Sequence, residues 1–208
     1  DFRRLEMVSP YGQSSTQLDA TYEQLNAALG FKTSPVTGLW FNIYGGYQDL
    51  KNNLASAAIA NYSGSYLQLL QGNMHNIYAG AEASYSYKDI ISFTASGVYR
   101  DWKTAKTENN SGDQLLYYMP SFEANFKVDI RPISSVLINL GYQHITREKI
   151  GNERVDPVGN LYLGGSYEVF EGISIYVRAN NLLNKDYQYY WGYPTEGINF
   201  MGGVSFRF

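Results

Sequence analysis

The sequence contains no cysteine and only two histidines, His75 and His144. Without cysteine there are no disulfide bonds and no thiolate metal ligands. Also missing are the Gly-x-Ser-x-Gly, His-Glu-x-x-His and phosphate-binding glycine motifs that accompany common enzyme chemistries. We therefore predict no catalytic residue, no metal site and no cofactor, and we interpret both histidines as polar residues near one rim of the fold.

Long apolar runs and charge are scarce as well. No stretch approaches the run of about 18 apolar residues that a transmembrane helix requires. Charged residues make up 17% of the chain and the net charge is −3, without the basic patch of a nucleic-acid-binding protein. Aromatic residues are abundant instead, with 20 Tyr, 10 Phe and 3 Trp. Aromatic girdles at the two bilayer interfaces of a β-barrel would account for this excess.

A period of two in hydropathy dominates the sequence and is clearest near its end. The residues of one face are Ile173, Ile175, Val177 and Ala179, followed after a loop by Phe200, Gly202, Val204, Phe206 and Phe208. The intervening residues are mainly polar. Such alternation places successive side chains on opposite faces of a sheet. Strands of about ten residues that are apolar on one face and polar on the other are typical of a barrel wall in lipid.

The same alternation predicts nine strands, at about 18–33, 39–48, 76–85, 91–100, 118–128, 136–143, 160–169, 173–180 and 198–208. Short turns are predicted at 34–37, 88–89, 131–134 and 171–172, and long connections at 50–71, 104–114, 147–157 and 181–197. All the short turns fall on one side of the sheet, as in bacterial barrels, which turn tightly in the periplasm and loop widely outside. The predicted fold is therefore all-β, an antiparallel transmembrane β-barrel wall.

The odd number of strands predicts that this wall is the C-terminal part of a larger barrel, of the 22-strand type. Bacterial single-chain barrels have even strand numbers, and large plugged transporters reach 22 strands. Residues 1–16 would be an extracellular loop remnant, 17–208 strands and loops, and the plug domain would not be present. An unpaired strand edge in hydrocarbon costs several kcal/mol for each polar group. We therefore expect either another chain that supplies strands or a sheet whose two edges do not meet.

Six charged residues are expected on the polar face, where a charge avoids lipid. They are Glu82, Arg100, Glu123, Lys127, Glu168 and Arg178. A lumen-facing position leaves three roles open: lining a solute path, contacting a plug, or forming a solvated and mutually paired wall.

The last long connection holds an aromatic cluster, formed by Tyr187, Tyr189, Tyr190, Trp191 and Tyr193. Exposed aromatic side chains offer rigid, amphipathic contact area for a ligand. Tyr and Trp are also the girdle residues of any membrane barrel. Ligand contact and girdle or loop packing are therefore both open for this cluster.

Three short segments carry a resemblance to a known family. The segments Asn181-Leu182-Leu183-Asn184-Lys185-Asp186-Tyr187, Tyr193-Pro194 and Val204-Ser205-Phe206-Arg207-Phe208 resemble the C-terminus of a TonB-dependent outer-membrane receptor. The terminal Phe208 is similar to the signal by which Gram-negative barrels are recognised for insertion. At Glu196-Gly197-Ile198 the chain departs from the Pro-Gly-Arg-like turn that is more frequent in this family.

The resemblance implies a function and a set of partners. It implies a barrel segment in the Gram-negative outer membrane for TonB-dependent uptake of a scarce solute of the siderophore, glycan, peptide or cofactor class. The implied partners are outer-membrane lipid, the remaining barrel strands and plug, and an inner-membrane energising complex acting through the plug. Two alternatives stay open: a scaffold β-barrel subunit without transport, and a small outer-membrane hydrolase.

Overall fold

The computed structural model describes residues 4–9, 12–17, 19–61, 64–104, 116, 119–147, 156–190 and 193–207. Its regular elements are all strands. They are β1 (Arg4–Ser9), β2 (Gly12–Gln17), β3 (Tyr22–Val36), β4 (Leu39–Asn61), β5 (Gly64–Tyr87), β6 (Ile91–Thr104), β7 (Pro120–Ile130), β8 (Val136–Arg147), β9 (Val158–Phe170), β10 (Ile173–Asn180), β11 (Gln188–Tyr190), β12 (Tyr193–Pro194) and β13 (Asn199–Phe206). The prediction of an all-β chain is confirmed.

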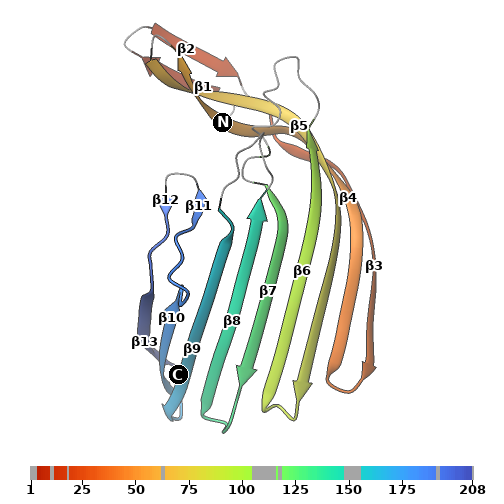
Figure 1. Cartoon of the computed structure of the whole chain (residues 1–208), viewed down its shortest axis with the longest axis vertical. Coiled ribbons are helices and arrows are strands. Elements are labelled where there is room, and N and C mark those ends of the chain that lie inside the picture. Colours follow the sequence, from red (N-terminus) through yellow and green to blue (C-terminus); the bar gives the residue numbers. More distant parts are fainter. Residues whose placement is uncertain are drawn as a thin grey trace.

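Nine of these strands form one antiparallel sheet, in the order β13-β10-β9-β8-β7-β6-β5-β4-β3. Along the chain, each of the nine strands pairs only with the previous and the next strand of the same sheet. The topology is therefore a simple meander (Figure 1). The edge strands are β3 and β13, and no pairing joins them in the part of the chain that the structure describes. The sheet is therefore open, as the strand count predicts.

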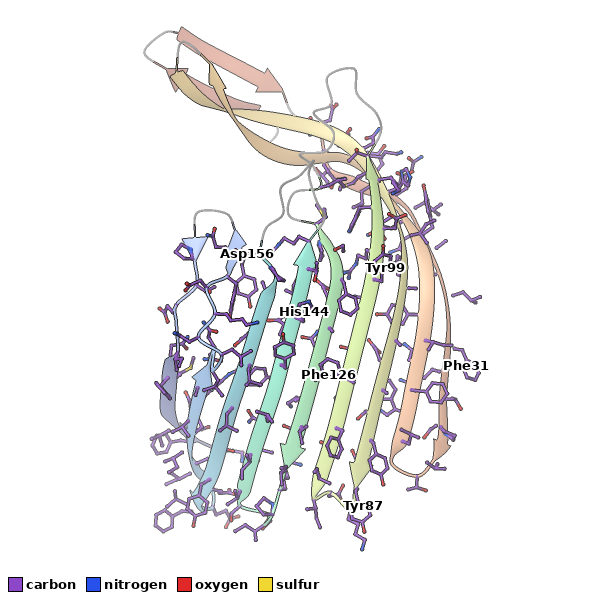
Figure 2. All side chains as sticks on the ribbon, in the orientation of Figure 1. Phe31, Tyr87, Tyr99, Phe126, His144 and Asp156 are labelled. Carbon is purple, nitrogen blue, oxygen red and sulfur yellow. The ribbon has the colours of Figure 1, made fainter. Side chains whose placement is uncertain are left out.

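The two faces of the sheet differ in polarity, and the register keeps them apart. One row runs across four strands from Phe41 through Ala83 and Ala95 to Phe126, and all its members are apolar. We call this side the apolar face, and the opposite side the polar face. Large side chains on the apolar face are exposed, with 85% of Leu29 and 79% of Phe200 accessible. Figure 2 shows Phe31 on the same face of β3 projecting away from the sheet.

Very little of the sheet is buried within the chain itself. Among the described residues, the buried apolar side chains are Met74, Trp102, Ala124, Val158 and Tyr187. Soluble monomers seldom expose a contiguous apolar surface of more than a few hundred Å². The apolar face therefore requires an apolar environment outside the described chain.

Tight turns join the strands at one end of the sheet, which we call the turn end; the opposite end is the loop end (Figure 1). Lys88 and Asp89 have φ values of 46° and 55°, and Gly172 has a φ of 81°, as hairpin turns require. The predicted turns at 88–89 and 171–172 are confirmed. The predicted turn at 34–37 is displaced, because β3 continues to Val36 and the chain reverses at Gly38, where φ is 81°.

The hairpin formed by β4 and β5 is much longer than predicted. We expected a loop at 50–71, but the two strands stay paired from Leu39 and Tyr85 out to Asn61 and Gly64. The ladder is interrupted by a register shift between Leu50 and Asn53 and then resumes. The Asn, Ser and Ala residues of this segment disfavour strands only weakly, and cross-strand pairing overrides that preference.

A bulge at Asn52 marks the point where the long hairpin leaves the wall. Asn52 has a φ of 54°, and its amide donates to Asn73 Oδ1 at 3.1 Å. Its carbonyl accepts from Thr21 Oγ1 at 2.7 Å, and its side-chain amide donates to the Ala20 carbonyl at 3.1 Å. Bulges bend and twist a strand locally. Beyond this point the hairpin bends out of line with the wall and extends across the loop end (Figure 1).

The predicted loop at 1–16 is also wrong in part, because it contains the paired strands β1 and β2. Polar composition suggested a loop, whereas a register from Arg4–Gln17 to Ser9–Gly12 forms a separate hairpin. The predicted loops at 104–114 and 147–157 lie largely outside the described residues.

Candidate functional site

The six charged residues predicted to face the lumen all occupy polar-face positions of the register. Their direct cross-strand partners include Ser96 for Glu82, Tyr78 for Arg100 and Thr94 for Lys127. Val98 lies opposite Glu123, Ser174 opposite Glu168 and Gly164 opposite Arg178. The alternation thus gathers these charges on one face, and their role toward a solute or a plug stays a prediction.

Several of these charges are paired within the wall. Arg100 Nη1 lies 3.0 Å from Glu123 Oε2 between β6 and β7, with both side chains less than a third exposed. Lys127 Nζ lies 2.8 Å from Asp129 Oδ2 along β7. Partly exposed pairs of this kind stabilise modestly, by about 0.2–1 kcal/mol. They fit the interpretation of a paired wall.

Glu168 has a structural contact that the sequence did not indicate. Its Oε1 accepts a hydrogen bond from the Gly172 amide at 3.2 Å and lies 3.8 Å from Arg207 Nη2. The carboxylate therefore closes the last tight turn. The contacts of the Glu168 carboxylate are therefore with residues at the turn end of the sheet.

Arg178 lies in a polar ladder across β10 and β13. Its guanidinium lies 4.2 Å from the ring centre of Tyr162, and its Nε donates to Asn180 Oδ1 at 2.7 Å. Asn180 Nδ2 in turn donates to Asn199 Oδ1 at 3.0 Å. Arg178 is exposed and forms no ion pair with a described carboxylate. It is therefore the predicted polar-face cation that stacks on an aromatic ring and keeps an accessible charge.

Four tyrosines on the polar face lie opposite glycines of a neighbouring strand: Tyr44 and Gly80, Tyr78 and Gly46, Tyr162 and Gly141, Tyr176 and Gly203. A Cβ atom at Gly80 would lie only 2.4 Å from the Tyr44 ring, and one at Gly141 only 2.2 Å from the Tyr162 ring. Each tyrosine ring therefore packs directly against the backbone of the glycine opposite it. The sequence analysis noted glycines within strands but missed this pairing, because it depends on register.

The aromatic cluster of the last connection divides into a packed and an accessible part. Tyr187 is only 4% exposed, and its ring meets that of Tyr189 at right angles with the centroids 5.7 Å apart. Burial raises the pKa of the Tyr187 hydroxyl, and the neighbouring Tyr189 raises it further. Tyr189 is 38% exposed, and its hydroxyl donates to Gln143 Oε1 at 3.1 Å. Tyr187 thus packs the segment, and ligand contact stays a prediction for the accessible ring.

The remaining members of the cluster are less fully described. Tyr190 and Tyr193 are paired across β11 and β12. Their side chains and the whole of Trp191 lie outside the described part of the chain, as does Phe208. The predicted roles of these residues stay predictions.

Asn181 organises the connection between β10 and β13, and sequence reasoning did not assign it this role. It is 1% exposed and has a φ of 50°. Its side chain donates to the carbonyls of Lys185 and Glu196, both at 3.0 Å, and accepts from the Lys185 amide at 3.1 Å. Its own amide donates to Asn160 Oδ1 at 2.9 Å. Asn181 is the first residue of the segment 181–187 that resembles the TonB-dependent receptor family. Its structural role could be recognised only from the fold.

Both histidines lie on the apolar face near the loop end. The rings of His75 and Tyr47 are 5.8 Å apart, and those of His144 and Tyr142 are 6.3 Å apart and stacked (Figure 2 labels His144). His144 Nε2 also lies 2.9 Å from Thr146 Oγ1. Each histidine therefore belongs to an aromatic and polar rim, as expected from the sequence.

Two further kinds of feature, a membrane-spanning helix and a metal-binding cluster, are not found among the described residues. No helix in the described ranges is long and apolar enough to cross a membrane. Nor do these ranges hold a group of His, Asp and Glu side chains suited to bind a metal ion.

An antiparallel meander that exposes large apolar side chains on one face and gathers charge on the other defines a class, the wall of an outer-membrane β-barrel. Solved structures bear this out. The copper transporter OprC matches with a TM-score of 0.68 at 18% identity, over 88% of this chain and 31% of its own. A mutant of the ferric enterobactin receptor PfeA from Pseudomonas aeruginosa matches with a TM-score of 0.66 at 15% identity, over 94% of this chain and 33% of its own.

A further match is the outer-membrane expressed OmpT of Vibrio cholerae, with a TM-score of 0.57 at 12% identity, over 87% of this chain and 55% of its own. No protein-family model matches the sequence, and no curated protein matches it significantly. The chain spans about a third of the length of OprC and PfeA. Its fold is therefore that of part of a TonB-dependent receptor barrel.

Proposed function

We propose that this chain forms part of the wall of an outer-membrane receptor that imports a scarce solute in a TonB-dependent manner. The observation that carries the proposal is the two-faced open sheet. The matches to OprC and PfeA cover 88% and 94% of this chain and about a third of each of those chains. Those two proteins are a copper transporter and a ferric enterobactin receptor. Siderophores, glycans, peptides and cofactors are the solute classes we consider for this chain.

In this proposal the chain acts passively. The apolar face contacts the lipid of a Gram-negative outer membrane, and the turn end lies in the periplasm. The polar face forms the lumenal lining around a plug, and the loop end carries the ligand-contacting loops. The open edges at β3 and β13 pair with further strands, because unpaired backbone groups are not tolerated in hydrocarbon. Energy comes from an inner-membrane complex that acts through the plug. The proposal includes no nucleic-acid partner and no catalytic activity.

The test uses the full-length protein expressed in Gram-negative cells with and without TonB. We expect a heat-modifiable outer-membrane barrel, a TonB cross-link in intact cells, and uptake of a metal chelate or glycan only in cells that contain TonB. A folded outer-membrane barrel without a TonB cross-link would contradict the receptor function and support the scaffold alternative. A protein that stays monomeric in water without detergent would contradict the membrane location itself.

The hydrolase alternative has its own test. It predicts that the purified barrel cleaves an ester or peptide substrate and that His75→Ala or His144→Ala abolishes the cleavage while the barrel stays folded. We expect neither variant to change any such turnover, because each histidine lies among aromatic rings on the apolar face.

A further inference from the structure

A groove of about 520 Å³ crosses the apolar face over β8, β9, β10 and β13. Gly165 and Gly202 form its floor, because they lie on the two strands that flank Val177 and pair with it from either side. Leu163 and Phe200 stand beside them as walls. Two missing side chains in one row thus leave a depression between Leu163 and Phe200.

The groove is open to the surroundings of the sheet. Its wall residues are exposed, Leu163 at 44%, Val177 at 67% and Phe200 at 79%. Ile138 and Ala179 complete an apolar lining. Its volume falls in the range of about 300–1,000 Å³ that is usual for small-molecule sites. If the apolar face contacts lipid, as the proposed function requires, an acyl chain is the group that meets this groove.

A cation lies beyond the loop end of the groove. Gly159 is four residues from Leu163 along β9 on the same face, a distance of about 13 Å at the usual rise of a strand. A Cβ atom at Gly159 would lie 3.3 Å from the Tyr142 hydroxyl and 3.8 Å from Lys185 Cδ. The Lys185 side chain therefore crosses the apolar face beside the Tyr142 hydroxyl. It is exposed and forms no ion pair with a described carboxylate.

The fold fixes the backbone position from which the Lys185 side chain extends. Asn181 binds both the amide and the carbonyl of Lys185, at 3.1 Å and 3.0 Å. Tyr142 stacks on His144, which is itself 2.9 Å from Thr146 Oγ1. The Lys185 side chain, the Tyr142 hydroxyl and the His144 imidazole thus lie together on the loop-end side of the apolar groove.

We propose that this arrangement binds one phosphate-bearing lipid of the outer leaflet. The acyl chain lies in the groove over Gly165 and Gly202, and the phosphate contacts Lys185 and the Tyr142 hydroxyl. The proposal rests on the proposed membrane location of the apolar face. It is favoured over a second copy of the chain because Lys185, an exposed cation with no ion pair to a described carboxylate, lies on the loop-end side of an apolar groove, and an anionic headgroup joined to an acyl chain complements both.

The experiment uses the full-length protein in nanodiscs of phosphatidylcholine with a small fraction of diphosphorylated lipid A. Native mass spectrometry counts the lipid molecules that stay bound after release. Gly165→Leu fills the groove, and the new Cβ meets nothing nearer than the Leu137 carbonyl at 3.7 Å. Gly97→Leu is the matched control, because its Cβ would also have its nearest contact at 3.7 Å. Ala179→Leu fills the groove from another strand in case Gly165→Leu does not fold.

We expect one retained lipid A molecule on the parent protein and on Gly97→Leu, and about a tenfold lower occupancy on Gly165→Leu and Ala179→Leu. Lys185→Gln should weaken retention about fivefold, and only for phosphorylated lipid A. Its control is Lys103→Gln, which removes a charge that already pairs with Asp101 at 2.9 Å.

Three results would overturn the proposal. Equal retention by Gly165→Leu and its control would exclude the groove as the site. Equal retention of phosphorylated and dephosphorylated lipid A would exclude the phosphate contact. A dimer abolished by Gly165→Leu would assign the groove to a second copy. Each is measured on protein that shows heat-modifiable migration, so failure of the membrane location itself is detected separately.

Discussion

Along β4 the apolar face presents Phe41 and Ile43, while the polar face of the same strand presents Gln48. Ile43 is 53% exposed, so what contacts it is the surrounding medium. Gln48 instead accepts from Asn76 Nδ2 at 2.8 Å and donates to Glu23 Oε1 at 2.6 Å. Side chains on the apolar face therefore depend on the medium around the sheet. Side chains on the polar face depend on hydrogen-bond partners within the chain. Substitutions on the two faces should fail for different reasons.

The largest expected difference comes from placing a charge on each face of β4. Ile43→Lys places an ammonium group on the apolar face, and a lysine near the bilayer midplane costs about 2–4 kcal/mol. The neighbouring Asn42→Lys places the same charge on the polar face opposite Glu82, where we expect a change below about 1 kcal/mol. Reversible urea unfolding from phospholipid vesicles measures both. Equal costs for the two variants would contradict the assignment of faces.

A smaller effect is expected where tyrosine lies over glycine. Gly80→Ala places a Cβ 2.4 Å from the Tyr44 ring, which must rotate away from the sheet, and overpacking of this kind costs about 1–3 kcal/mol. Gly97→Ala is the control, because its nearest contact is at 3.7 Å and it lies on the apolar face. The free energy of unfolding is the readout, and combining Gly80→Ala with Tyr44→Ala should relieve the cost.

The smallest effect is expected at the Arg100–Glu123 pair. A double-mutant cycle with Arg100→Gln and Glu123→Gln should give a coupling of about 0.2–1 kcal/mol, and high salt should reduce it. A coupling of several kcal/mol would mean that the polar face is dry at this depth. It would then be better described as the inside of a packed core than as a solvated lining.

The alternation of residues such as Ile173 to Asn180 was sufficient to predict the strands, because a period of two reports directly which face meets which medium. The odd number of strands predicted from this alternation also indicated that the sheet has open edges. The alternation failed for the upper part of the β4–β5 hairpin, where the Asn, Ser and Ala composition resembles a loop. What extends those strands is their pairing with each other across the register shift after Leu50.

The candidate site was less predictable than the fold. Polar-face charges followed from alternation, but the contact of Glu168 with the Gly172 amide depends on the geometry of one turn. The burial of Tyr187 accompanies its contacts with Tyr189 and Thr195, and the hydrogen-bond network around Asn181 includes the carbonyl of Glu196, 15 residues further along the chain. Such contacts leave no local pattern in the sequence. The family-like segment indicated that these positions matter and did not indicate why.

The meander has a consequence for assembly. Each strand of the nine-stranded sheet pairs only with the strands before and after it in the meander, so no step of sheet growth has to join distant parts of the chain. Loop-closure entropy grows with the length of the loop, and folding is slower when contacts join distant parts of the chain. This wall can therefore grow one hairpin at a time from either edge. A substitution that stops one strand from pairing should arrest insertion at that strand and leave the hairpins already formed intact.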